Sequence, residues 1–190
     1  RLLCLVALTL LALQLYFVLR IALMVLVDPY STSFQRSEAW RLLRERGRIE
    51  WSQQWVADDR IAANLKRAVI ASEDTAFTDH GGVEWDAIER AWERNQRAEA
   101  HAEQRNQRNA GGRPPVEPKI VGGSTITQQT VKSLLLSPER RFDRKVKEMI
   151  LARRLEQHLT KDEILALYLN QIYFGGGAWG IGEAARTYFG

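Results

Sequence analysis

Two short segments of this chain carry side chains that could do chemistry on a sugar or a phosphate. The first, residues 73–82, holds the carboxylate of Glu73 and the imidazole of His80 among turn-forming residues. The second, residues 122–129, places hydroxyl and amide groups directly after two glycines. A carboxylate can act as a general base, and hydroxyls and amides can hold sugar hydroxyls or phosphate oxygens. The plain alternative for Glu73 is an exposed residue at a helix end.

Cations and a second carboxylate follow downstream of these segments. Lys132 offers a point charge, and the planar fork of Arg140 can hold phosphate oxygens through two bonds. The plain alternative for both is a cation on a solvated surface. Arg144 and Glu148 are four residues apart, which by itself predicts only an exposed ion pair worth about 0.3–0.5 kcal/mol.

Helices must position these groups, because apolar residues recur at spacings of three and four rather than in alternation. One helix is predicted to begin with Asp58 or Asp59 as its N-cap and to place Glu73 at or just past its C-terminal end. A second helix is predicted from about Trp85 to Gln96.

Helical periodicity continues in the last third of the chain. It is carried by Val146, Met149, Ile150 and Leu155, and another helix follows Thr160, its predicted N-cap. No segment shows the clean alternation of a strand, so the predicted fold class is mainly α.

Residues 97–118 differ in composition from their surroundings. They are rich in Ala, Glu, Gln, Asn and Arg, end in a Gly- and Pro-rich stretch, and have almost nothing to bury. We predict a mobile loop here.

The N-terminal residues have the composition of a membrane anchor. Residues 2–19 are almost uninterruptedly apolar, about the length that crosses a bilayer core. After Arg20 the apolar character resumes over 21–27, a segment expected to lie along the membrane interface or to pack on the domain. The predicted organisation is membrane helix and interfacial segment over 1–27, linker and membrane-proximal region over 28–57, and one catalytic domain over 58–190.

The net charge indicates which kinds of partner the protein could bind, and the histidine and cysteine residues indicate whether it could bind a metal. A net charge of +4 and a pI near 9.4 are compatible with nucleic acid, anionic lipid or a pyrophosphate substrate, and the anchor favours the last two. The three histidines are scattered, and Cys4 is the only cysteine. No metal site is therefore predicted.

Four motifs in a fixed order resemble the family-51 peptidoglycan glycosyltransferases. They are Glu73-Asp74-x-x-Phe77-x-x-His80-x-Gly82, then Gly122-Gly123-Ser124-Thr125-Ile126-Thr127-Gln128-Gln129, then Arg144-Lys145-x-x-Glu148, and last Lys161-x-x-Ile164-Leu165-x-x-Tyr168-Leu169-Asn170. The resemblance covers residues 28–190 and implies a lysozyme-like glycosyltransferase domain. It points to the monofunctional branch of the family, with residues trimmed from both termini.

The resemblance also implies roles for individual residues. Glu73 would be the catalytic base and Glu148 the second essential carboxylate. The residues implied to bind substrate are Ser124, Thr125, Gln128, Gln129, Lys132, Arg140 and Arg144. The supporting residues are Asp74, Phe77, His80 and Gly123. The chain departs from the pattern with Ser133 in place of Asn and Glu84 in place of Asp.

The activity implied is an inverting hexosyl transfer that polymerises lipid II into β-1,4 glycan strands and releases undecaprenyl pyrophosphate. The implied partners are lipid II, the growing strand, membrane lipid and other cell-wall synthesis proteins, and no nucleic acid. No fixed cofactor is implied, although Mg²⁺ or Mn²⁺ could sit near the pyrophosphate. The implied location is the inner membrane, single-pass, with the domain in the periplasm. The rival hypotheses are a membrane-bound muramidase and a non-enzymatic envelope scaffold.

Overall fold

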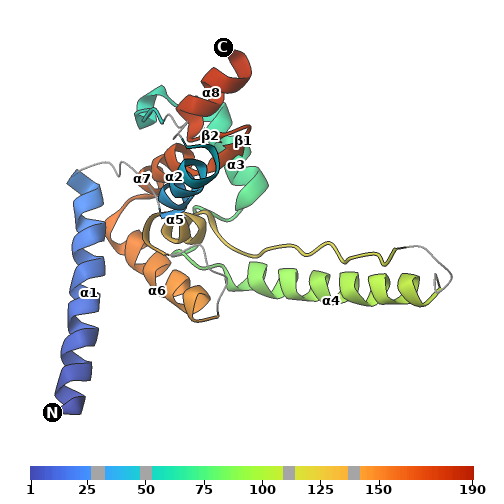
Figure 1. The fold of residues 1–190 in the computed structure, drawn as a ribbon, viewed down its shortest axis with the longest axis horizontal. Helices are drawn as coiled ribbons and strands as arrows, with labels where there is room; N and C mark the ends of the chain where they lie inside the picture. Colours follow the sequence, from blue (N-terminus) through green and yellow to red (C-terminus); the bar gives the residue numbers. More distant parts are fainter. Residues whose placement is uncertain (27–32, 48–52, 109–113, 137–141) are drawn as a thin grey trace.

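The computed structural model describes residues 1–26, 33–47, 53–108, 114–136 and 142–190. Within these ranges the chain is mainly helical, as predicted (Figure 1). The elements are α1 (Leu2–Leu26), α2 (Ser33–Arg46), the 3₁₀ turn η1 (Asp58–Arg60), α3 (Ala63–Glu73), α4 (Trp85–Arg108), α5 (Ile126–Leu135), α6 (Phe142–His158), α7 (Lys161–Gln171), β1 (Tyr173–Gly175), β2 (Ala178–Trp179) and α8 (Ile181–Phe189). The two strands form a small antiparallel sheet.

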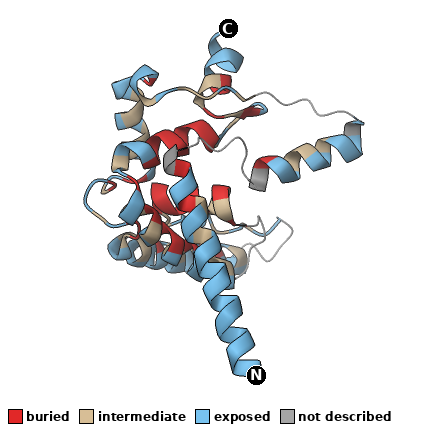
Figure 2. Ribbon diagram, turned by 90° about the vertical axis from the view of Figure 1, so that its left-hand side faces the viewer, coloured by how far each residue is buried: buried red, intermediate tan, exposed pale blue. Residues whose placement is uncertain are grey.

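The core lies where α5, α6 and α7 pack on one another. Figure 2 shows the buried residues gathered in these central helices. The most enclosed is α7, in which every residue from Ile164 to Gln171 is buried. Its polar Asn170 is satisfied by exchanging two hydrogen bonds with the backbone of Val56, 2.8 and 3.0 Å long. Burial of these apolar side chains is the main stabilising contribution to the fold.

The anchor helix α1 is longer than predicted and is partly built into the domain. Residues 2–24 form the one described helix long and apolar enough to cross a membrane. The sequence predicted a separate apolar segment from residue 21, but α1 continues without a break to Leu26. Ile21 and Met24 are buried in the core, and α1 packs on α6 there. Of the two predicted placements for this segment, packing on the domain is confirmed.

Two further boundaries differ from the prediction. The expected linker contains α2, whose Gln35 is fully buried and which packs on α5. Asp58 lies in η1, and α3 begins only at Ala63, after an Ala62 that makes no side-chain cap. The Asp58 or Asp59 cap was therefore wrong, because a 3₁₀ turn uses these residues instead. Thr160 is confirmed as the N-cap of α7, in a capping box with Glu163.

Helix α4 contradicts the predicted loop over 97–118. It runs to Arg108, and an extended segment from residue 114 returns beside it to α5, so that the two form an arm that projects from the body (Figure 1). The helix can form without a large apolar face because the residues against the return segment are small or amide-bearing. These are Ala87, Ala91, Asn95, Ala98, Ala102 and Asn106, spaced three and four apart.

Two asparagines hold the arm together. Asn95 exchanges two hydrogen bonds with the backbone of Val121, 3.0 and 2.8 Å long. Asn106 does the same with Val116, at 3.1 and 2.7 Å. Eleven helical residues rise about 16 Å and five extended residues span about the same length, so both pairs fit in one register.

Candidate active site

Glu73 is the last residue of α3, as predicted, and its side chain is exposed. The Gln129 amide nitrogen on α5 donates a hydrogen bond of 3.1 Å to Glu73 Oε2. The other carboxylate oxygen, Oε1, makes no hydrogen bond to any residue that the structure describes. The carboxylate is thus oriented by one oxygen and has the other available to accept a proton.

Tyr168 on α7 supports this arrangement from below. Its hydroxyl donates a long hydrogen bond, 3.4 Å, to Gln129 Oε1, which leaves the Gln129 amide nitrogen to face Glu73. Burial, and secondly the negative charge of Glu73, raise the pKa of the Tyr168 phenol well above its ordinary value. Tyr168 therefore remains a hydrogen-bond donor.

Asp74 and His80 hold the turn after Glu73. Asp74 is buried and accepts a 2.9 Å bond from the backbone N–H of Ile126, at the start of α5. His80 Nδ1 accepts from the N–H of Gly82, so its proton is on Nε2, which donates to the Asp74 carboxylate at 3.0 Å. This is the geometry expected of supporting residues, because both side chains are used within the protein.

Phe77 and Lys161 form the base of the same turn. Phe77 is 1% exposed, and the Lys161 ammonium lies 4.6 Å from its ring centroid. Lys161 also donates to the carbonyl of His80 at 2.6 Å and to Glu156 at 2.7 Å. Lys161 of the fourth motif thus contacts the turn formed by the first motif.

Thr125 and Gln128 both have a structural role at the start of α5. They form the capping box of α5: the Thr125 hydroxyl accepts from Gln128 N–H, and the Gln128 side chain accepts from Thr125 N–H. The Thr125 hydroxyl also donates to Gly82 O at 2.8 Å. Gln128 is fully buried and Thr125 is 2% exposed. Both residues build the helix start that carries Gln129, and Thr125 also lies in a wall of the polar cavity. Their direct contact with substrate stays a prediction.

Two glycines allow backbones to approach closely around the site. A Cβ on Gly82, which has a positive φ of 93°, would lie 2.8 Å from the Ala152 backbone on α6. A Cβ on Gly123 would lie 2.8 Å from the Ala87 carbonyl oxygen on α4. Gly123 thus supports the site by letting the 121–125 segment lie against α4.

Glu148 on α6 is buried and surrounded by positive charge. Its side chain is 2% exposed, with Arg144 bonded to Oε2 at 2.8 Å and Lys145 to Oε1 at 2.6 Å. The exposed ion pair that spacing alone allowed is therefore not what forms. Lys145 also donates to the Ser124 hydroxyl at 2.8 Å, which connects Glu148 to the glycine-rich segment. Sequence reasoning missed Lys145, although its place three residues before Glu148 was a usable signal.

Lys132 is half-buried near the end of α5, one helical turn after Gln129 and so on the same face. Ser133, the departure from the family pattern, follows it and is also half-buried. Arg140, the other predicted phosphate ligand, lies outside the described residues. Lys132 thus lies on the face of α5 that carries Gln129, the partner of Glu73.

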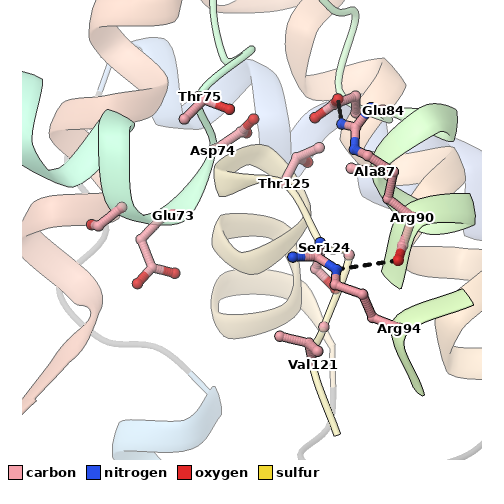
Figure 3. Close-up of a pocket in the computed structure, with 13 residues that line it drawn as sticks. Glu73, Asp74, Thr75, Glu84, Ala87, Arg90, Arg94, Val121, Ser124 and Thr125 are labelled. Carbon is pink, nitrogen blue, oxygen red and sulfur yellow. Dashed lines mark hydrogen bonds and ion pairs between the residues drawn. The ribbon is translucent and has the colours of Figure 1, made fainter. Parts of the chain in front are cut away.

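A polar cavity of about 310 Å³ joins these elements. One wall is Ser72–Thr75 at the end of α3, and a second is 121–125. The third is Glu84 together with Ala87, Arg90 and Arg94 of α4 (Figure 3). Neither arginine was singled out from the sequence, because without contacts nothing distinguishes them from the other charges of α4.

The described residues do not fit a metal held by the protein. They contain no group of three or more His, Cys, Asp or Glu side chains placed to share an ion. Both oxygens of Glu148 accept hydrogen bonds from cations, which leaves that carboxylate poorly placed as a ligand.

Comparison with known proteins gives one family. Residues 41–190 match the family model described as Transglycosylase. A protein of Burkholderia thailandensis named biosynthetic peptidoglycan transglycosylase is 43% identical over 179 residues, which cover 94% of this chain and 63% of the relative. Proteins of the same name from Burkholderia orbicola and Paraburkholderia xenovorans are both 42% identical, with 94% and 97% of this chain covered and 66% and 69% of theirs.

The chain therefore spans about two thirds of the length of these curated relatives. The family match covers every described part of the site, from α3 to α7. It agrees with the mainly helical, lysozyme-like domain that the motifs implied. On this match and on this identity over nearly the whole chain, the protein belongs to the transglycosylase family of peptidoglycan glycosyltransferases.

Proposed function

We propose that the protein polymerises a lipid-linked disaccharide, lipid II, into linear β-1,4 glycan strands. The observation that carries this proposal is a cavity that is lined by Glu73 and is linked to a cation through Ser124. Glu73 opens on the cavity, and Lys145 reaches its Ser124 wall from the buried Glu148. A base near cations suits a transfer in which a hydroxyl is deprotonated and a pyrophosphate departs.

In the proposed reaction, Glu73 Oε1 takes the proton from the 4-hydroxyl of the acceptor's terminal N-acetylglucosamine. That oxygen attacks the anomeric carbon of the strand's lipid-linked end, forming the new glycosidic bond with inversion. The bond to undecaprenyl pyrophosphate breaks, and the leaving group keeps the electron pair. Gln129 holds Oε2 meanwhile, so that the base keeps its orientation.

Negative charge grows on the departing pyrophosphate, and cations must meet it. We assign this task to Lys132, Arg144 and Lys145, together with Arg140. Glu148 would hold Arg144 and Lys145 in place rather than take a proton, because both of its oxygens accept bonds from them. Side-chain cations would thus supply the charge without a fixed cofactor.

We further propose that α1 spans the inner membrane once, with the domain on the periplasmic side. One apolar helix of 23 residues supports a single-pass anchor. Anchoring keeps the site next to a substrate whose lipid never leaves the bilayer, and other cell-wall synthesis proteins would work beside it.

The test is to incubate the detergent-solubilised protein with labelled lipid II and to look for polymer. We expect polymer from the wild type and a loss of at least about a hundredfold for Glu73→Gln, because general-base catalysis is worth roughly 10²–10⁴ in rate. Glu89→Gln, a change at an exposed glutamate of α4, is the matched control and should behave as wild type. No polymer from the folded wild type would refute the proposal.

The same preparation separates the rivals. A muramidase would shorten finished glycan, and it needs a carboxylic acid free to donate a proton. It also needs a second carboxylate, and both oxygens of Glu148 already accept hydrogen bonds from Arg144 and Lys145. An envelope scaffold would remain functional in cells after Glu73→Gln, whereas a polymerase would not.

A further inference from the structure

The α4 wall of the cavity carries two arginines whose chemistry the proposed mechanism does not use. Arg90 and Arg94 are four residues apart on one face of α4, and both line the cavity that contains Glu73. Arg90 is paired with Glu84 at 2.5 Å. Arg94 makes one hydrogen bond, from Nε to the Arg90 carbonyl at 3.2 Å, and its two terminal nitrogens have no partner among the described residues.

The Arg94 side chain is exposed and lines the cavity. Figure 3 shows it folding back from α4 over the 121–125 segment, with its guanidinium beside Ser124 and facing the wall that carries Glu73. The neighbouring Asn95 grips Val121 by two hydrogen bonds, and Gly123 lies against the Ala87 backbone. These contacts hold the 121–125 segment against the part of α4 that carries Arg94.

The proposed reaction requires two diphosphates to be handled at once. One leaves with the lipid of the growing strand, and the other stays on the acceptor whose hydroxyl attacks. The proposed mechanism assigns the cations of α5 and α6 to the first of them. A guanidinium fork with two unused donors is suited to the other, since Arg binds phosphate oxygens through paired bonds.

We infer that Arg94, with Arg90 beside it, binds the diphosphate that the acceptor retains. This rests on the proposed function and names a substrate group that the cavity would recognise. The arrangement of the elements supports it, because α4 and α6 lie toward the side on which α1 projects, away from α8 (Figure 1). A lipid-linked acceptor reaching up from the membrane would meet this side of the domain first.

The test compares two soluble acceptors in the full chain, with labelled lipid II as donor. One disaccharide-peptide carries a short-chain lipid diphosphate on its anomeric carbon, and the other carries a methyl group there. For Arg94→Ala we expect the KM of the diphosphate acceptor to rise about tenfold to a hundredfold, the loss typical of a charge-assisted bond, with kcat changed little. The KM of the methyl glycoside should not change. For Arg94→Lys we expect a KM of the diphosphate acceptor between those of the wild type and Arg94→Ala.

Arg105→Ala is the matched control, because Arg105 lies eleven residues further on the same face of α4 and outside the cavity. It should leave both KM values unchanged. Thermal unfolding of each variant shows whether it is folded.

Three results would overturn the inference. In one, Arg94→Ala raises both KM values equally; in another, it lowers only kcat. In the third, its effect disappears when the peptide carboxylates of the acceptor are amidated, which would make them the bound anion. A wild-type protein that makes no polymer at all refutes the proposed function instead, and is distinguished by the lipid II assay.

Discussion

At the scale of single residues, Lys145 is the side chain that joins the buried Glu148 to the cavity through Ser124. We expect Lys145→Met to lower the free energy of unfolding by about 1–3 kcal/mol, because a buried carboxylate loses one of its two partners. Polymer formation should fall about tenfold or more, since a cation near the leaving group is lost. Thermal unfolding and the lipid II assay measure the two effects.

Lys147→Met is the control for that change. Lys147 lies two residues further on α6 and pairs only with Asp143, with both side chains about half exposed. Its removal should change the free energy of unfolding by less than about 0.5 kcal/mol. Equal losses for the two lysines would show that Lys145 has no special role.

The raised pKa of Tyr168 leads to a prediction about the stability of the protein at alkaline pH. Its raised pKa means that the unfolded chain loses this proton near pH 10 while the folded chain keeps it. The stabilising contribution is complete below pH 10 and is lost as pH rises toward the folded pKa, by about 1.4 kcal/mol per pH unit. In Tyr168→Phe the thermal midpoint should therefore fall less between pH 9 and pH 11 than in the wild type.

Tyr188→Phe provides the background for this experiment, because it removes an exposed tyrosine from the same domain. The decisive quantity is the difference between the two slopes of midpoint against pH. If both variants match the wild type throughout, burial of the Tyr168 phenol contributes nothing to the alkaline response.

At the scale of elements, we expect opposite effects on stability from alanine at two adjacent glycines in the segment between α4 and α5. A Cβ at Gly123 would clash with the backbone of Ala87 at 2.8 Å, whereas a Cβ at Gly122 meets nothing within 4 Å. We expect Gly123→Ala to cost about 1–3 kcal/mol of unfolding free energy and to lower activity, because neither backbone can move aside freely. Gly122→Ala should cost little. Chemical denaturation of both proteins tests the difference.

The sequence predicted elements well where local rules decide them. Thr160 and Glu163 form the capping box that a Thr-x-x-Glu pattern indicates, and α3 ends at Glu73 as its periodicity required. The long apolar run of α1 was readable by length alone. In each case the feature depends only on residues that are close together in the sequence.

The rest depends on contacts between distant segments. The polar composition of 97–118 indicated a loop, yet residues to Arg108 are helical because a return segment pairs with them through Asn95 and Asn106. Thr125 and Gln128 carried hydroxyl and amide groups suited to a substrate, but the helix start uses them. The bond from Lys145 to Ser124 and the place of Arg94 in the cavity both depend on segments that are distant in the sequence.

At the scale of the whole molecule, the anchor and the catalytic domain are one packed unit. Ile21 is fully buried against the domain, while Leu23, two residues away on α1, is 53% exposed. We expect Ile21→Ala to lower the free energy of unfolding by about 2–4 kcal/mol and Leu23→Ala to change it far less, since only the first leaves a cavity. Thermal unfolding in one detergent compares them.

This packing has a mechanical result. Helix α1 contacts α6, the helix that carries Glu148 and its two cations. The depth of the site relative to the bilayer would then be set by where α1 sits in the membrane, rather than by a flexible tether. A variant whose Ile21 contact is weakened should lose activity in membranes more than in detergent.

The arm of α4 carries a rule about how its length can change. The helix and the extended return segment differ in rise per residue. The hydrogen bonds of Asn95 and Asn106 both form because eleven helical residues have about the same length as five extended ones. Adding a residue to one side alone would move an asparagine away from its backbone partner on the other side. Natural insertions or deletions in this arm should therefore come as coupled changes, with roughly two helical residues for each extended one.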